Sequence, residues 1–236
     1  MKNHNQIISQ VIDDLKAKAR PDYKKFAERM IPSSLEILGV STPDMRKVIK
    51  HWFIEFKELS YNEYLALMLD FKATRIFECI QISHELIAKN KMFREKLSEQ
   101  DIDKLLIGLD NWATVDAFSM YISGPAWINN QISNTQIMNW SESDNVWLRR
   151  LAIVSCVFLN QKSKSEDWKR DITINLCKLH FLDKEAIIHK AISWALRSLV
   201  KNHPEAVQDF INENSETIKP YVRREVQNKI NTGRKN

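Results

Sequence analysis

The segment DNWATVDAFSMYISG, residues 110–124, places an aromatic ring and a carboxylate at a spacing that suits one face of a helix. Asp110 or Asn111 can cap this helix, and Trp112 and Asp116 then lie four positions apart, one above the other. Indole faces attract cations, and carboxylates carry negative charge. An acidic side chain beside a large ring is unexpected in a chain with a formal charge of +5, so both residues are candidates for function.

A second group of residues carries the opposite charge. In KEAIIHKAISWALRSLVKN, one helical face holds Lys190, Trp194, Arg197 and Lys201 at spacings of four, three and four, with no acid among them. In SESDNVWLRRLAI, Trp147 and Arg150 lie three apart. Cations that neutralise phosphates, interleaved with rings that contact sugars or bases, suit nucleic acid. The alternative is packing, because an indole on a helix more often belongs to a core or a helix contact.

The other residues that could do chemistry favour structural interpretations. Cys79, Cys156 and Cys177 have no CxxC pairing and the six histidines have no ligand spacing, so neither a disulfide framework nor a metal site is expected. Structural roles are predicted for two sets of side chains. Trp52, Trp127, Trp140, Trp147 and Trp168 are expected to pack, and His51, His84, His180 and His189 to lie on helix surfaces or at helix ends.

Helical periodicity runs along the whole chain and predicts an all-α protein. Gly occurs 4 times and Pro 6 times in 236 residues, and both lie mainly between the periodic segments. Caps and apolar spacing predict helices over 7–19, 22–30, 43–56, a segment after Ser60, 74–89, 99–109, 111–123, 134–140, 144–160, 166–180, 184–202, 204–214 and 218–230.

Short connections between these helices indicate antiparallel pairs that repeat every 35 to 45 residues, as in a HEAT-type array with a concave face. Residues 1–236 show no linker and are expected to form a single domain whose last few residues fray. The start lacks an apolar run long enough for a signal peptide, and 18 consecutive apolar residues occur nowhere, so a cytoplasmic location without a membrane partner is expected.

Four segments resemble a known family in the same order and at similar spacing: LGVSTPDMRKVIK, DNWATVD, SDNVWLRRLAI and KAISWALR. The chain resembles the HEAT-like-repeat DNA alkylation repair family, the AlkD-like alkylpurine DNA glycosylases, from its first helix to about residue 230. The resemblance implies a right-handed solenoid of HEAT-like repeats, an α-α superhelix, whose basic concave groove holds duplex DNA. It also implies a monomer, no cofactor, and association with the nucleoid when the protein is bound to DNA.

The resemblance also implies site residues. Asp116 matches the family's catalytic aspartate, Trp112 and Trp194 match aromatics that line the lesion, and Arg150 matches an arginine that holds the DNA backbone. Three further cations on the stripe of Trp194 are expected to contact phosphates: Lys190, Arg197 and Lys201. The implied activity is that of a monofunctional glycosylase, which hydrolyses the N-glycosidic bond of N3- or N7-alkylated purines in duplex DNA without full base flipping.

One departure from the family keeps other functions open. Active members often carry an aromatic and a lysine in the second helix, where this chain aligns Met30 and Pro32. Relatives altered there keep the fold, lose excision and bind branched or distorted DNA, which makes a non-catalytic DNA-binding paralogue the main alternative. A HEAT-like scaffold for protein partners is the third possibility, and it predicts an apolar or mixed-charge groove.

Overall fold

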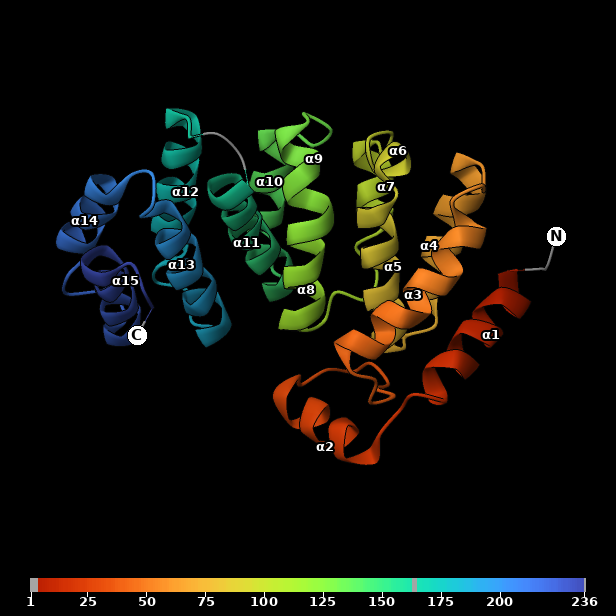
Figure 1. The fold of residues 1–236 in the computed structure, drawn as a ribbon. Helices are drawn as coiled ribbons and strands as arrows, with labels where there is room; N and C mark the ends of the chain where they lie inside the picture. The colour runs from red at the N-terminus through yellow and green to blue at the C-terminus, as the bar shows by residue number, and fades with distance from the viewer. Residues whose placement is uncertain (1–3, 163–164, 236) are drawn as a thin grey trace. The chain divides into compact units, whose positions relative to one another are not determined.

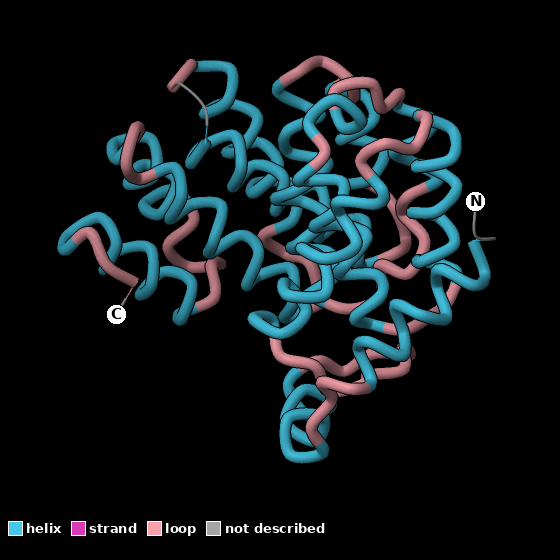
Figure 2. The backbone as a smooth tube through the Cα atoms, turned by 45° about the vertical axis from the view of Figure 1, so that its right-hand side comes forward, coloured by secondary structure: helices cyan, strands magenta, loops and turns pink. Residues whose placement is uncertain are grey.

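The computed structural model describes residues 4–162 and 165–235, and every regular element among them is a helix (Figure 2). The expected all-α fold is therefore confirmed. The chain divides into two compact units, Met1–Ile122 and Ser123–Asn236, which are described separately. The expectation of a single domain stays a prediction.

The first unit contains α1 to α8 and most of a π-helical turn, η1 (Figure 1). Its elements are α1 His4–Lys16, α2 Pro21–Met30, α3 Thr42–Phe56, α4 Tyr61–Ala73, α5 Phe77–Lys89, α6 Lys91–Arg94, α7 Glu99–Lys104, α8 Trp112–Phe118 and η1 Ser119–Ser123. Local capping chemistry sets several of the starts. The Ser41 side chain accepts the N–H of Asp44, and Ser60 with Glu63 forms a capping box at the start of α4.

Helix α5 is the centre of the first unit, because α3, α4 and α8 all pack against it. The apolar side chains between these helices are fully buried, and each contributes roughly 1.5–3 kcal/mol by leaving water. The buried carboxylate of Glu78 on α5 organises the loop before α3, since it accepts N–H bonds from Leu38, Gly39 and Val40 at 2.9, 2.8 and 3.1 Å. Gly39 is required there, because its φ is 92° and an added Cβ would lie 2.6 Å from the Cβ of Lys24.

The second unit is built around α11 and α13, which pack against each other along their lengths. Its elements are the end of η1, α9 Gly124–Ile128, α10 Asn134–Ser141, α11 Val146–Lys162, α12 Asp167–His180, α13 Ala186–Leu199, α14 Pro204–Glu213 and α15 Pro220–Thr232 (Figure 1). The core face of α13 consists of Ile188, Ala191, Ile192, Ala195, Leu196 and Leu199, whereas Ile187 is only half-buried. Helix α10 covers one side of α11, and α12 and α15 also pack on α13.

The predicted helix 111–123 does not end at Ser123. Helix α8 passes through η1 directly into α9, with Pro125 in the first turn of α9. Proline has no N–H and is tolerated in the first turn of a helix, so Gly124 and Pro125 do not terminate the helical path here. The prediction 99–109 was also too long, because α7 ends at Lys104.

Two of the minor structural predictions are wrong. His84 and His189 are buried within their helices, at 0% and 3% exposure, rather than on helix surfaces. Polar partners make this possible: His84 Nε2 lies 2.7 Å from Lys72 Nζ, and His189 Nε2 lies 2.7 Å from the carbonyl oxygen of Asp183. His180 is the last residue of α12 and thus lies at a helix end, as predicted. Trp168 is 40% exposed, and its ring packs against that of Trp127, with the ring centres 6.2 Å apart. The burial predicted for Trp52, Trp127 and Trp140 is confirmed.

Candidate DNA-binding and catalytic site

The first turn of α8 presents the two residues singled out by the sequence. Asn111 is the cap, since its side-chain oxygen accepts the N–H groups of Ala113 and Thr114, both at 3.0 Å. Trp112 is the first residue of the helix and remains 37% exposed, and Asp116 follows one turn later and is half-buried. The predicted helix start is confirmed, and a ring and a carboxylate occupy successive turns of it.

Trp112 also joins α8 to α2 through a hydrogen bond. Its indole Nε1 donates to the carbonyl oxygen of Met30, the last residue of α2, at 2.9 Å. The final carbonyls of a helix have no partner within the helix, so this bond satisfies one of them and fixes the ring orientation.

A second tether joins the segment after α2 to the start of α8. Asp110 Oδ1 accepts the hydroxyl of Ser33 at 2.6 Å, and Asp110 Oδ2 accepts the N–H and the hydroxyl of Ser34 at 2.8 and 2.6 Å. Partial burial alone would raise the pKa of Asp110, but the bonds from Ser33, Ser34 and Asn111 outweigh it and lower the pKa below its usual value. Asp110 is therefore an ionised structural residue that joins the segment after α2 to the start of α8.

The aromatic side chains of α2 were missed by the sequence interpretation. Met30 at the end of α2 is 49% exposed and Pro32 after it is also exposed, and Tyr23 and Phe26 of α2 line a cavity together with Trp112. The guanidinium groups of Arg20 and Arg29 lie 5.6 and 5.9 Å from the ring centres of Tyr23 and Phe26. Positions 23, 26 and 30 share one helical face, and this spacing is the signal that could have identified them.

In the second unit, Arg150 connects α11 to the start of α13. Its Nη1 donates to the carbonyl oxygen of Ile187 at 2.7 Å, and the residue is only 5% exposed. Lys190 follows Ile187 by three positions and is exposed, and Trp194 follows Lys190 by one turn and is half-buried. The structure thus brings Arg150 to the amino-terminal end of the predicted basic stripe.

The residues of α13 alone form a stripe without an acid, but a neighbouring helix brings a carboxylate close to it. Glu225 on α15 lies 3.9 Å from Arg197 Nε, which also donates to the carbonyl oxygen of Ser193 at 3.1 Å. Burial lowers the pKa of Arg197, and Glu225 opposes that shift. Burial alone would raise the pKa of Glu225, but bonds from Ser193 and Lys235 and the charge of Arg197 lower it overall. Lys201, at the other end of the stripe, is exposed.

The predicted site draws on both units. Trp112 and Asp116 belong to the first unit, and Arg150, Lys190, Trp194, Arg197 and Lys201 belong to the second. Each group is assembled within its own unit as described, and the convergence of the two groups around DNA stays a prediction.

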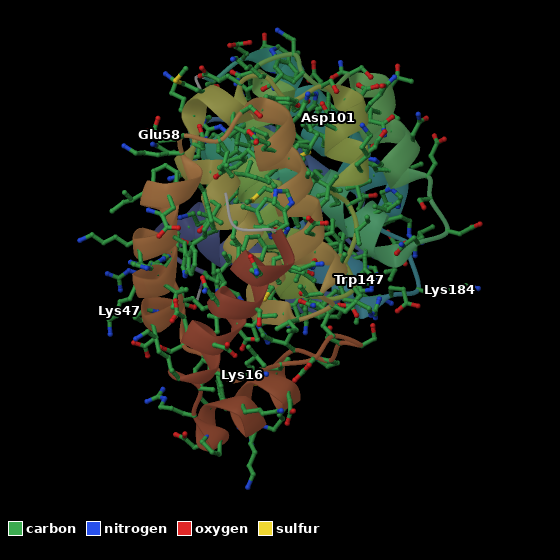
Figure 3. The ribbon with its side chains drawn as sticks, turned by 90° about the vertical axis from the view of Figure 1, so that its right-hand side faces the viewer. Lys16, Lys47, Glu58, Asp101, Trp147 and Lys184 are labelled. Carbon is green, nitrogen blue, oxygen red and sulfur yellow. The ribbon has the colours of Figure 1, made fainter. Side chains whose placement is uncertain are left out.

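Charged surface residues elsewhere differ in whether they form an ion pair. Lys47 on α3 pairs with Asp44 at 2.6 Å and points away from the ribbon, whereas Lys184 before α13 extends into solvent (Figure 3). In the described part of the chain, no group of His, Cys, Asp and Glu side chains could hold a metal ion. Within the same residues, no helix has the length and apolar character needed to cross a bilayer.

Comparison with known proteins defines the class and then the family. Two solved structures share the fold. One is described as a predicted DNA alkylation repair enzyme from Enterococcus faecalis, at 18% identity and TM-score 0.72 over 89% of this chain and 95% of that chain. The other belongs to a new family related to the HEAT-like repeat DNA glycosylases with affinity for branched DNA structures, at 15% identity and TM-score 0.69 over 97% of this chain and 95% of that one.

The fold is thus the HEAT-like helical repeat fold, which confirms the predicted fold class. Residues 11–230 match the family model described as DNA alkylation repair enzyme, and the chain belongs to this family. No curated protein sequence matches the chain. Membership supports a role in DNA repair.

Proposed function

We propose that the protein is a monofunctional DNA glycosylase that removes positively charged N3- or N7-alkylated purines from duplex DNA. The observation that carries the proposal is the arrangement at the start of α8, in a chain of the DNA alkylation repair enzyme family. There Trp112 is fixed by Met30, and Asp116 lies one turn away on the same helix.

The chemistry of the substrate explains why one carboxylate would suffice. An alkylated purine already carries a positive charge, so it leaves as a neutral base while the deoxyribose becomes oxocarbenium-like. Asp116 would stabilise this developing cation and position the attacking water, as carboxylates do in glycoside hydrolysis. No strong general acid is required for the leaving group.

The rings would favour the charged nucleotide over a normal one. A cation over an indole face gains roughly 0.5–2 kcal/mol, depending on how far it is desolvated. Trp112 is 37% exposed, and Trp194 is proposed as the second ring that contacts the lesion. Arg150, Lys190, Arg197 and Lys201 would contact the DNA backbone, and the base would leave without being fully rotated out of the duplex.

The test is alkali-dependent strand breakage. Duplex DNA that contains 7-methylguanine is incubated with the protein and then heated in alkali, which breaks the strand only where an abasic site has formed. Asp116→Asn should abolish breakage and keep DNA affinity nearly unchanged, and Asp209→Asn on the exposed face of α14 serves as the matched control. Loss of affinity together with activity in Asp116→Asn would argue against the catalytic role.

A second candidate is a non-catalytic protein that binds branched DNA. The solved relative with affinity for branched DNA, and Met30 and Pro32 in place of an aromatic and a lysine, favour it. A wild-type protein that gives no breakage but prefers a four-way junction to a linear duplex would establish this alternative.

The DNA-contact residues are tested separately. Lys190→Ala and Lys201→Ala should each reduce the slope of log affinity against log salt by about 0.9, because each removed phosphate contact releases one counterion fewer. Lys50→Ala on the exposed face of α3 should leave the slope unchanged.

A further inference from the structure

A lysine and a histidine are buried together where α4, α5 and α8 meet. Lys72 on α4 and His84 on α5 are both 0% exposed, and Lys72 Nζ lies 2.7 Å from His84 Nε2. The ring of Phe118 on α8 completes the group, with its centre 5.3 Å from Lys72 Nζ and 5.5 Å from the centre of the His84 ring. Two basic groups this close repel each other when both are protonated, so the pair carries no more than one positive charge.

A surface loop, residues 105–111, covers the pair on one side. The carbonyl oxygen of Ile107 accepts a hydrogen bond from Lys72 Nζ at 3.3 Å, while the Ile107 side chain is 51% exposed. Gly108 shapes this loop, because its φ is 80° and an added Cβ would lie 2.5 Å from Cδ1 of Ile80. The loop continues into Asn111, the cap of α8, so a displacement at Ile107 is passed directly to the start of α8.

No acid compensates the buried charge within the described residues, since neither Lys72 nor His84 forms an ion pair there. Asp116 lies two positions before Phe118, which places it on the opposite side of α8. Lys89, the other cation of α4, α5 and α8, is exposed. The carboxylates of α4, α5 and the loop bond elsewhere: Glu63 with Ser60, Asp70 with His4, Glu78 with backbone N–H groups, Glu85 with Arg46, and Asp110 with Ser33 and Ser34.

The imidazole of His84 can serve Lys72 in either protonation state. Its Nε2 accepts a hydrogen bond from the ammonium, or it donates its own hydrogen to the neutral amine. The neutral amine is therefore well accommodated, whereas the ammonium has only neutral partners in an apolar surrounding. For this reason burial lowers the pKa of Lys72 to about 7.

This difference links the proton to an opening of the structure. The pKa of a solvated lysine is about 10.4, so any opening that brings water to Lys72 restores its affinity for a proton. Between pH 7 and 10 the open form binds more protons than the closed form, and the closed form gains about tenfold in the equilibrium constant per pH unit. Below pH 7 both forms hold the proton, and the closed form has lost this advantage. Displacement of the loop provides such an opening, because Ile107 contacts both Lys72 and solvent.

We propose that Lys72 and His84 form a proton-dependent latch beneath α8. Uptake of a proton by Lys72 releases the loop 105–111 and loosens the start of α8, and loss of that proton closes the loop again. The order of the segment that carries Trp112 and Asp116 then depends on pH. The bearing of the latch on excision rests on the proposed function, whereas the opening itself can be measured without DNA.

Hydrogen–deuterium exchange followed by mass spectrometry measures the opening in the full chain. In the wild type, the protection of peptides from residues 103–118, corrected for the intrinsic exchange rate, should rise about tenfold per pH unit from pH 7 to 9. Peptides from α3 should show no such rise, and they report whether the opening is local.

Variants assign the effect to the amine. Lys72→Met removes the titrating group, so the protection of residues 103–118 should no longer vary with pH. His84→Gln should keep the rise, because an amide oxygen still accepts a hydrogen bond from the ammonium. Lys50→Met, on the exposed face of α3, is the matched control and should behave as the wild type does. Circular dichroism verifies that each variant is folded.

A second measurement uses the wild type and needs Lys72→Met only for assignment. Nitrogen NMR of the protein labelled at its lysine side chains should show one amine that titrates at about pH 7. The signal of this amine should be absent from Lys72→Met and present in His84→Gln.

A rise in protection confined to residues 103–118 supports the latch, as does its loss in Lys72→Met. Wild-type protection that does not change with pH, an equal rise in the α3 peptides, or lysine amines that all titrate near pH 10 would overturn it. Excision of 7-methylguanine without this exchange pattern would leave the proposed function intact. The exchange pattern in a protein that excises nothing would keep the latch and remove its bearing on excision.

Discussion

The indole Nε1 of Trp112 lies 2.9 Å from the carbonyl oxygen of Met30, so the residue that opens α8 holds the residue that closes α2. The hydrogen bond uses the N–H of the indole for a structural contact, so the face of the ring remains for contact with a ligand. The divergent second helix and the candidate lesion-binding ring are thus mechanically connected, and changes in one should be felt in the other.

Trp112→Phe tests this connection, because it keeps an aromatic ring and removes the donor. The free energy of unfolding should fall by about 0.5–1.5 kcal/mol, the net value of one hydrogen bond, as measured by urea denaturation. Trp168→Phe is the control, since its indole bonds only to Glu166 two residues away on the surface. An equal loss of unfolding free energy in both variants would show that the hydrogen bond to Met30 stabilises the fold no more than the surface bond of Trp168 does.

Asp110→Asn should make the protein less sensitive to acid. The pKa of Asp110 is lowered in the folded protein, so its ionised form stabilises the fold above its unfolded pKa of about 3.9, and this contribution is lost as pH falls through the folded pKa. Wild type should lose more stability between pH 5 and 2 than Asp110→Asn does, followed by circular dichroism. Parallel acid profiles, with Asp209→Asn as reference, would contradict the tether to Ser33 and Ser34.

Lys72→Met should change how stability depends on alkaline pH. Lys72 is fully buried with its Nζ near His84, the carbonyl oxygen of Ile107 and the Phe118 ring, and burial lowers its pKa to about 7. The pKa of a lysine in the unfolded chain is about 10.4. Between pH 7 and 10 the unfolded chain therefore binds more protons than the folded protein does, and the stability of the wild type rises with pH. The stability of Lys72→Met relative to wild type should therefore fall by up to about 4 kcal/mol across this window.

The Lys72 measurement needs a matched surface lysine. Lys50→Met, on the exposed face of α3, removes an ammonium group from the surface instead and serves as the reference. A pH-independent difference for Lys72→Met would mean that the buried ammonium keeps its ordinary pKa.

Glu225→Gln should strengthen DNA binding if Arg197 faces phosphate. The substitution removes the charge 3.9 Å from Arg197 Nε, while the Gln side chain can still accept the bond from Ser193. Affinity should rise severalfold, and the salt dependence should steepen by about 0.9 for one additional phosphate contact. Glu205→Gln, exposed on α14, is the control, and identical salt slopes for all three proteins would remove Arg197 from the DNA interface.

Local chemistry made much of the fold predictable. Ser60 and Asn111 begin their helices as expected, because a cap needs only the backbone two or three residues ahead of it. Trp112 and Asp116 share a helix for the same reason. The assignment of the family followed from short ordered segments and holds over residues 11–230.

Long-range pairing accounts for what was missed. Asp110 bonds to residues 76 and 77 positions earlier, and Lys72 is buried beside His84, so neither polar residue shows its role in the periodicity around it. Glu225 meets Arg197 from another helix, which a helical wheel of α13 alone does not reveal. The cavity beneath α2 depends on three other helices, although the aromatic spacing of Tyr23 and Phe26 gave a partial signal.

The carboxylate of Glu78 has a consequence for the order in which the chain folds. The loop from Leu38 to Val40 takes its shape from an acid 38 to 40 residues downstream, so this loop lacks its carboxylate partner until α5 is present. Contacts between residues close in sequence form quickly, whereas loop closure over a longer stretch is slower. During synthesis the loop between α2 and α3 is therefore fixed only after α5 has been made, and Glu78→Ala should slow refolding around Trp112, followed by its fluorescence.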